Sequence, residues 1–476
     1  MKGILTALIS LISISAFSQY KISVIAPQYK QGIAYLTYHM GKNLNLQDSG
    51  VVNNKGQVVF SGSKKLPGGI YSIVFPGKAF TSDFFVDKAQ QIKISLADTL
   101  KPQDIVIEGS PENVLFEKYQ KFIATKGPDI QRARQNFMTA KTAADSVKFE
   151  KEFNVLNNEI SEYRNSIIKN NPESMMAALL LAMKESPYPT KVAVTRQDSI
   201  DNYNFYKSHY WDGITFMDDR IVRTPFFIPK FERYYRDVMP QSSDSIIKDI
   251  DYKLLLARSA PELYKFMLNW FTDEYINPKY MGQDAIFVHL FNKYHSKGLT
   301  PWLNEKQMEI ITRRAYMQMA NLIGEPASNL TLLDSTGKVR ELYSLKSPYT
   351  VVIFWDPNCG HCKEELPRID SVYRANWKKK GVKIYAVLTE NHIPEWVNYI
   401  KKHDLGEWTH VYQSEEMAEA EKKSNAASYR QLYDVTQTPT VYLLDADKRI
   451  IGKKLTWEQI NDLLEVKEKS KNTNEK

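Results

Sequence analysis

The spacing of apolar positions changes twice along the chain and predicts three folded regions. Up to residue 109, short apolar runs alternate with turn sequences such as Pro67-Gly68-Gly69, a pattern typical of β-strands. The predicted strands are Ala34–Tyr38, Val58–Phe60, Ile70–Phe75, Phe84–Val86, Ile92–Leu96 and Ile105–Ile107. Short, regularly spaced strands predict a small antiparallel β-sandwich or barrel over residues 19–109.

From residue 110 to residue 323 the apolar spacing becomes helical. Ser110 is a capping hydroxyl, Pro111 suits the first turn, and Glu112 lies near the positive end of the predicted helix. Two apolar stripes follow at helical spacing. Their members are Leu115, Tyr119, Phe122 and Ile123, and then Leu263, Phe266, Met267, Trp270 and Phe271. The region is therefore predicted to be an all-α domain.

An aromatic-rich stretch, Tyr203 to Tyr235, lies inside this helical region. It includes the pairs Phe226-Phe227 and Tyr234-Tyr235. Such residues could line a groove for unfolded clients, or they could pack between helices. Packing is the favoured interpretation, because aromatic residues at helical spacing usually belong to a core.

From residue 324 to residue 466 strand and helix patterns alternate, which predicts an α/β domain. A hairpin is predicted from Leu330–Leu333 and Val339–Leu342 around the turn at Asp334-Ser335-Thr336-Gly337. The further strands are Tyr349–Trp355, Val382–Leu388, Thr440–Leu444 and Arg449–Ile451, and the helices follow Cys359 and span Pro394–Lys402 and Trp457–Val466. The polar, charged segment 467–476 is predicted to be disordered.

The first 18 residues have the pattern of a secretory signal peptide. Lys2 precedes an apolar run from Ile4 to Phe17, and the small residues Ala16 and Ser18 precede Gln19. A run of this length is too short for a stable membrane span. We expect cleavage before Gln19 and export, most readily to the periplasm, as a soluble or peripheral protein; the alternative is an uncleaved anchor.

Charge and cysteine content narrow the function classes. The 63 Lys and Arg against 55 Asp and Glu leave a net charge of +8 on 476 residues, and the two signs are interspersed. That argues against nucleic acid as a partner. The chain has two cysteines, Cys359 and Cys362. They are three positions apart, so a disulfide between them would not cross-link a long loop. Both cysteines instead indicate one local chemical site.

The residues around these cysteines suit redox chemistry. The strand Tyr349–Trp355 leads through a turn that contains Pro357 into a helix that starts at Cys359. A cysteine at a helix N-terminus favours the thiolate, which is the form that attacks disulfides. Cys362 lies one helical turn later, close enough to form a disulfide with Cys359. We therefore expect Cys359 to attack and Cys362 to resolve the mixed disulfide.

His361 lies between the two cysteines. A protonated imidazole there would stabilise the Cys359 thiolate and make the pair more oxidising; the alternative is an exposed spacer. A zinc site that uses His361 is disfavoured, because structural zinc needs four ligands and no second cysteine pair exists. No metal and no other cofactor is expected.

A second feature points to the same chemistry. Thr438-Pro439-Thr440 precedes the apolar strand Val441–Leu444, and it resembles the cis-proline loop of thioredoxin folds. Residues 324–466 as a whole resemble the TlpA/ResA-type branch of exported thioredoxin-like proteins. The matching motifs are Gly324-Glu325-Pro326-Ala327, Phe354-Trp355, Cys359-x-x-Cys362-x-x-Glu365-x-Pro367, the insertion at Thr389–Trp408 and Gln437-Thr438-Pro439-Thr440.

The resemblance implies a thioredoxin-like fold and roles for further residues. Glu365 is implied to handle protons at the thiols, Thr438 and Pro439 to contact an extended substrate, and Pro367 to kink the helix. Two departures stand out. Ile353 replaces the buried Asp found six residues before the first cysteine in ordinary thioredoxins, and the Gly-His dipeptide resembles protein disulfide isomerase, so the direction of electron flow stays open.

The upstream regions loosely resemble uncharacterised domains found before such modules, and they contain no catalytic motif. The favoured hypothesis is a thiol–disulfide oxidoreductase that acts on protein thiols and disulfides of the cell envelope, supplied by a membrane-bound thiol electron donor. The alternative is a binding or redox-sensing module that uses the thioredoxin-like domain as a scaffold. A peroxidase is disfavoured because Thr is absent three residues before Cys359.

Overall fold

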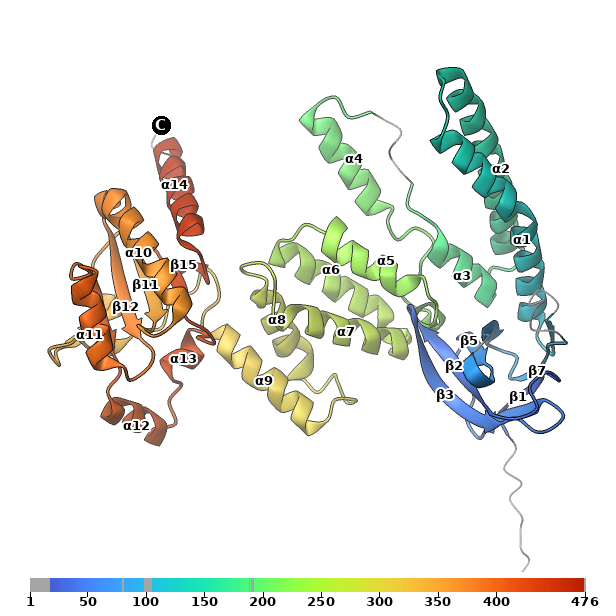
Figure 1. Ribbon diagram of the computed structural model, residues 1–476, viewed down its shortest axis with the longest axis horizontal. Helices are drawn as coiled ribbons and strands as arrows, with labels where there is room; N and C mark the ends of the chain where they lie inside the picture. Colours follow the sequence, from blue (N-terminus) through green and yellow to red (C-terminus); the bar gives the residue numbers. More distant parts are fainter. Residues whose placement is uncertain (1–17, 79–80, 98–104, 188, 190–191, 475–476) are drawn as a thin grey trace, which may run out of the picture. The chain divides into compact units, whose positions relative to one another are not determined.

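The computed structural model describes all residues except 1–17, 79–80, 98–104, 188, 190–191 and 475–476 (Figure 1). The predicted signal segment therefore lies almost wholly outside the described residues. The chain forms two compact units: residues 1–239 with 252–266, and residues 240–251 with 267–476. Within the described residues, no helix is both long and apolar enough to cross a membrane.

The N-terminal β region of the first unit consists of two four-stranded sheets. Their orders are β4-β1-β7-β8 and β3-β2-β5-β6. The strands are β1 (Tyr20–Ile25), β2 (Ile33–Met40), β3 (Asn43–Val51), β4 (Gln57–Gly62), β5 (Gly69–Val74), β6 (Thr81–Val86), β7 (Gln91–Ser95) and β8 (Val106–Glu108). Ile22 and Phe60 of one sheet share a buried core with Leu36 and Tyr71 of the other. The predicted sandwich is confirmed.

The pairing within this sandwich differs from the prediction in one place. β1 pairs with β7 in parallel, whereas the other pairs are antiparallel. β1 was not predicted, because Tyr20–Ile25 directly follows the apolar leader. Its residues alternate between buried and more exposed positions, which is the expected pattern for a strand with one buried face.

Helices complete the first unit. They are α1 (Pro111–Met138), α2 (Ala143–Asn170), α3 (Met175–Met183), α4 (Arg196–Ser208) and α5 (Phe227–Arg233). The predicted start of α1 is confirmed, because the Ser110 hydroxyl accepts the Asn113 N–H. The buried Asn113 amide in turn bonds the N–H of Phe85 at 2.7 Å and its carbonyl at 2.8 Å. These bonds fasten α1 to β6.

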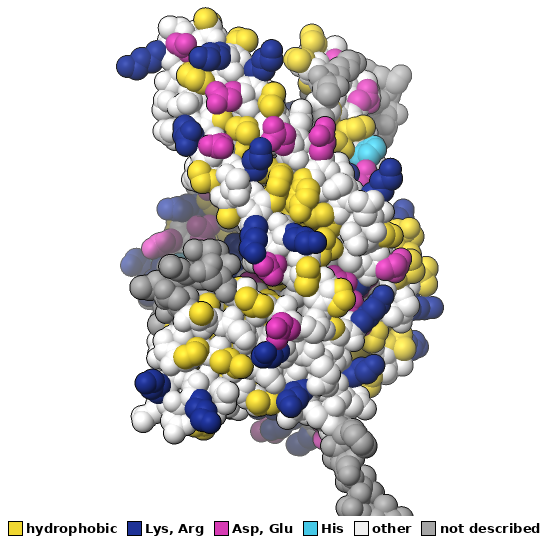
Figure 2. Space-filling model, turned by 90° about the vertical axis from the view of Figure 1, so that its right-hand side faces the viewer, with side chains coloured by type: hydrophobic (Ala, Val, Ile, Leu, Met, Phe, Trp, Pro, Cys, Tyr) yellow, Lys and Arg dark blue, Asp and Glu magenta, His cyan; other side chains and the backbone are white. Residues whose placement is uncertain are grey.

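The aromatic stretch is mainly core. Phe227, Phe231, Tyr234 and Tyr235 are all buried, and Trp211 contacts the rings of Phe227, Phe231 and Tyr234. The packing interpretation therefore holds for these residues. On the molecular face in Figure 2, basic and acidic side chains are interspersed, as the sequence indicates.

The second unit begins with helical segments and ends with a seven-stranded sheet. Helices α6 (Ser243–Leu256) and α7 (Pro261–Tyr275) contribute to both units, and α8 (Asp284–Leu290) and α9 (Glu305–Met319) belong to the second. The sheet order is β10-β9-β13-β12-β11-β14-β15. Its strands are β9 (Thr331–Leu333), β10 (Val339–Glu341), β11 (Tyr349–Trp355), β12 (Val382–Leu388), β13 (Thr409–Tyr412), β14 (Thr440–Leu444) and β15 (Ile450–Lys453).

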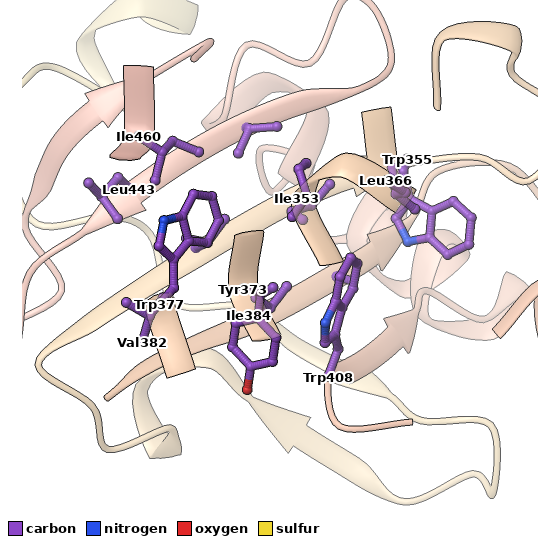
Figure 3. Packing of buried hydrophobic residues seen from close by; sticks show 14 of the residues in the cluster. Ile353, Trp355, Leu366, Tyr373, Trp377, Val382, Ile384, Trp408, Leu443 and Ile460 are labelled. Atoms are coloured by element: carbon purple, nitrogen blue, oxygen red, sulfur yellow. The ribbon is translucent and has the colours of Figure 1, made fainter. Parts of the chain in front are cut away.

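β11 is an interior strand of this sheet, and all seven of its residues are buried. It pairs in parallel with β12 and antiparallel with β14. Alternate residues supply two cores. Ile353 and Trp355 pack with α10 (Gly360–Ala375), α11 (Ile393–Lys402) and α14 (Trp457–Asn474) on one face (Figure 3), and the intervening residues pack against the other face. The α/β prediction is confirmed.

The C-terminal segment corrects one expectation. Residues 467–476 were predicted to be disordered, but α14 continues to Asn474. Two further helices, α12 (Glu415–Lys423) and α13 (Tyr429–Leu432), were not predicted. The extension has a physical reason: Lys and Glu favour helix, and adding residues to an existing helix avoids the cost of nucleation.

Candidate functional site

A short turn, residues 356–359, joins β11 to α10 and carries the first cysteine. We call it the cysteine turn. The Asp356 side chain accepts the N–H of Asn358 at 2.7 Å, and its carbonyl accepts the N–H of Cys359 at 3.2 Å. Cys359 is the N-cap of α10, with φ −72° and ψ 124°. Its sulfur therefore lies at the helix end where backbone N–H groups lack helical partners.

The two thiols have opposite environments. Cys359 is half-buried, whereas Cys362 is 1% exposed, and both are free thiols. Burial opposes ionisation of Cys359, but hydrogen bonds with the Thr438 side chain, with Cys362 and with the His361 backbone together lower the pKa of its thiol. Burial raises the pKa of the Cys362 thiol to about 12. One thiol is thus prepared to ionise, and the other stays protonated.

The loop before β14 faces Cys359. The Thr438–Pro439 peptide bond is cis, as the resemblance implied. The Cys359 thiol donates a hydrogen bond to the Thr438 carbonyl at 3.3 Å. This placement follows from the sheet, because Thr440 at the start of β14 pairs with Phe354 near the end of β11. The structure therefore brings together the cysteines and the predicted proline loop.

His361 and Glu365 are placed near the cysteines but differ in their contacts. His361 is exposed, and its backbone is the part that contributes a hydrogen bond to Cys359. Glu365 is half-buried in α10 and forms an ion pair with Arg368 at 3.3 Å. The tuning role of the His361 imidazole and the proton-handling role of Glu365 both stay predictions.

One pair of residues near the cysteines was not singled out from the sequence. Asp356 is 5% exposed, and its carboxylate is 2.9 Å from Nδ1 of His392, which precedes α11. Position 353 holds a fully buried Ile, so Asp356 is a buried carboxylate in a different place from that of ordinary thioredoxins. An Asp directly after a buried strand was the signal available in the sequence.

Comparisons with known proteins agree with this geometry. Residues 323–453 match the AhpC/TSA family, and residues 20–116 match a domain of unknown function, DUF4369. The thiol-disulfide oxidoreductase ResA of Bacillus cereus is 28% identical over 143 residues, which are 30% of this chain and 75% of that protein. ResA of Bacillus subtilis is 27% identical over 128 residues, 27% of this chain and 64% of that protein.

A solved structure also matches: a domain of a possible thiol-disulfide isomerase from Cytophaga hutchinsonii. It is 36% identical, with 32% of this chain and 97% of that chain covered and a TM-score of 0.28. The fold and the paired thiols define the class of the protein, a thioredoxin-like thiol–disulfide oxidoreductase. Over residues 323–453 the chain is similar to the AhpC/TSA family and to ResA.

Proposed function

We propose that this protein exchanges a Cys359–Cys362 dithiol or disulfide with protein substrates in the cell envelope. The observation that carries the proposal is the contrast between the two thiols. Cys359 is accessible and has a lowered pKa, whereas Cys362 is buried and has a raised pKa. A thiolate is the attacking species in disulfide exchange, so Cys359 is the nucleophile and Cys362 the resolving thiol.

The exchange is balanced in two steps. The Cys359 thiolate attacks a substrate disulfide, which forms a mixed disulfide and releases one substrate thiolate. Cys362 then loses its proton and attacks the Cys359 sulfur, which closes the internal disulfide and releases the second substrate thiolate. Two electrons pass from the protein to the substrate, and two protons neutralise the released thiolates. The reverse sequence oxidises a substrate dithiol.

Neighbouring residues have defined tasks in this scheme. Thr438 and Pro439 present backbone to an extended substrate segment next to the Cys359 sulfur. Glu365 is the candidate to accept the proton of Cys362, a step that needs help because burial holds the pKa of that thiol at about 12. His361 is the candidate that tunes the potential of the pair.

Serine variants test the assignment. We expect Cys359→Ser to abolish reduction of insulin disulfides, whereas Cys362→Ser forms mixed disulfides that are not resolved. Ser414→Cys is a matched control: it places a thiol at the N-cap of α12, a helix start without a second cysteine. Insulin reduction by Cys359→Ser at the wild-type rate would refute the assignment.

A binding or redox-sensing role is the second candidate. The observation in its favour is that residues 19–323, most of the chain, contain no cysteine. Proteins trapped by Cys362→Ser distinguish the two functions. Many different covalent clients support an enzyme, whereas one partner at equal stoichiometry supports a tethered module.

Export and electron supply complete the proposal. The apolar run from Ile4 to Phe17 supports export, so the mature chain should begin at Gln19 and fractionate with the periplasm. A membrane-bound thiol protein would restore the dithiol in each cycle. Intact Met1 on the cytoplasmic protein would contradict export. The reduction potential gives the direction: about −270 mV indicates a reductase, and about −180 to −120 mV an isomerase or oxidase.

A further inference from the structure

The buried residue Asp356 forms hydrogen bonds through its side chain and its backbone at the cysteine turn. Its side chain accepts the Asn358 N–H, and its carbonyl accepts the Cys359 N–H. Its backbone also forms a hydrogen bond with the Cys362 sulfur. Asp356 thus contacts both the turn that carries Cys359 and the sulfur of Cys362. A shift of Asp356 would move both sulfurs relative to each other.

The turn alone does not require a charged residue here. An Asn side chain offers the same acceptor oxygen to the N–H two residues later. A carboxylate on a side chain that is 7% exposed is costly to bury unless it is paired. His392 supplies the pairing: its Nδ1 is 2.9 Å from the second carboxylate oxygen. The turn therefore does not need the negative charge of Asp356, whereas the hydrogen bond with His392 makes use of it.

His392 lies at the surface, where solution pH can act on it; its side chain is 43% exposed. The charged groups that face it are Asp356 from the cysteine turn, Glu390 from the loop after β12, and Glu395 from α11. Arg430 of α13 forms an ion pair with Glu390 at 2.7 Å. The hydrogen bond with Asp356 is the largest cause that raises the pKa of His392 above its usual 6.5.

We propose that Asp356, held by protonated His392, is a positioning residue that keeps Cys359 and Cys362 in the geometry needed for disulfide exchange. The inference rests on the proposed function and deepens it. The hydrogen bond from protonated His392 to the Asp356 carboxylate has a charged donor and a charged acceptor. It is therefore stronger than the bond from a neutral imidazole. As pH rises through the raised pKa of His392, the imidazole loses its proton and its hydrogen bond to Asp356 weakens. The rate of disulfide exchange, divided by the fraction of Cys359 that is thiolate, then decreases.

Two substitutions test this role. Asp356→Asn keeps the acceptor for Asn358 but removes the charge, and His392→Gln keeps a donor for Asp356 but cannot titrate. We expect Asp356→Asn to lower kcat/KM for insulin reduction about tenfold and to return the pKa of His392, followed by NMR, towards 6.5. In His392→Gln, we expect the exchange rate per Cys359 thiolate to show no such decrease at high pH.

A control and two distinct failures complete the experiment. His403→Gln changes a histidine at the other end of α11, where it stacks on Tyr399, and should keep the wild-type profile. If Asp356→Asn and His392→Gln both match an active wild type in kcat/KM and pH profile, the positioning role is refuted. If wild type itself exchanges no disulfide, the proposed function fails, and the NMR shift of His392 then reports only the pairing.

Discussion

The contrast between the two thiols can be converted into an alkylation rate. At pH 8, a thiol with a pKa of about 12, as for Cys362, is ionised in about one molecule in 10,000. A thiol with a pKa of 9.0 is ionised in about one in ten, and Cys359 lies below that value. The thiolate populations therefore differ at least about 1,000-fold.

Intrinsic reactivity works against part of this difference. Nucleophilicity rises with pKa with a Brønsted coefficient of about 0.4–0.5, so three pKa units return a factor of about 16 to 32 to Cys362. Cys359 should still react about 30- to 60-fold faster. The burial of Cys362, at 1% exposure, widens the gap further because the reagent must reach the sulfur.

The assay compares variants that each keep one thiol. Reduced Cys362→Ser and Cys359→Ser proteins are treated with iodoacetamide at pH 8, and the modified fraction is followed by mass spectrometry. The main cause of the raised pKa of Cys362 is burial, which survives replacement of Cys359. Urea-unfolded samples, in which both thiols should react alike, provide the control. Rates within about threefold of each other in the folded proteins would refute the reasoning.

Two stability predictions concern buried titratable groups of the second unit. Lys453 donates to Asp284 and, at 2.9 Å each, to the carbonyl and side chain of Asn321. Lys453→Met leaves Asp284 buried without its cation and should cost about 3–5 kcal/mol in urea unfolding; Lys453→Met with Asp284→Asn should recover much of it, and no recovery would contradict the charge argument. Burial lowers the pKa of His410 to about 4, so below pH 6.5 the unfolded state binds the extra proton and stability decreases towards pH 4. The decrease should reach about 3 kcal/mol, and a His410→Gln variant with an equally steep acid profile would contradict it.

Local sequence signals located the cysteine turn. The apolar run that became β11 and the spacing of Cys359 and Cys362 lie within a few residues of one another, so strand, turn and helix start could be predicted together. The cis peptide before Pro439 was also predicted, because the resemblance fixed its place before a strand. These features depend on short-range geometry that sequence patterns carry well.

Contacts between distant segments could not be predicted in the same way. His392 is 36 residues from Asp356, and nothing in its local sequence indicates a carboxylate partner. The parallel pairing of β1 with β7 likewise joins the two ends of the β region. The helical end of α14 was missed for another reason: a polar composition was interpreted as disorder, although Lys and Glu also favour helix.

The anchoring of Lys453 has a consequence for truncation. The family match begins at residue 323, which suggests cutting there to obtain the redox domain alone. Such a fragment would lose Asp284 and Asn321, the partners of the buried Lys453 ammonium, and also Arg314, which pairs with the buried Asp434. The limit of the family is therefore not the limit of the folding unit, and a fragment that starts near residue 240 would preserve all of these partners together with residues 240–251 of that unit.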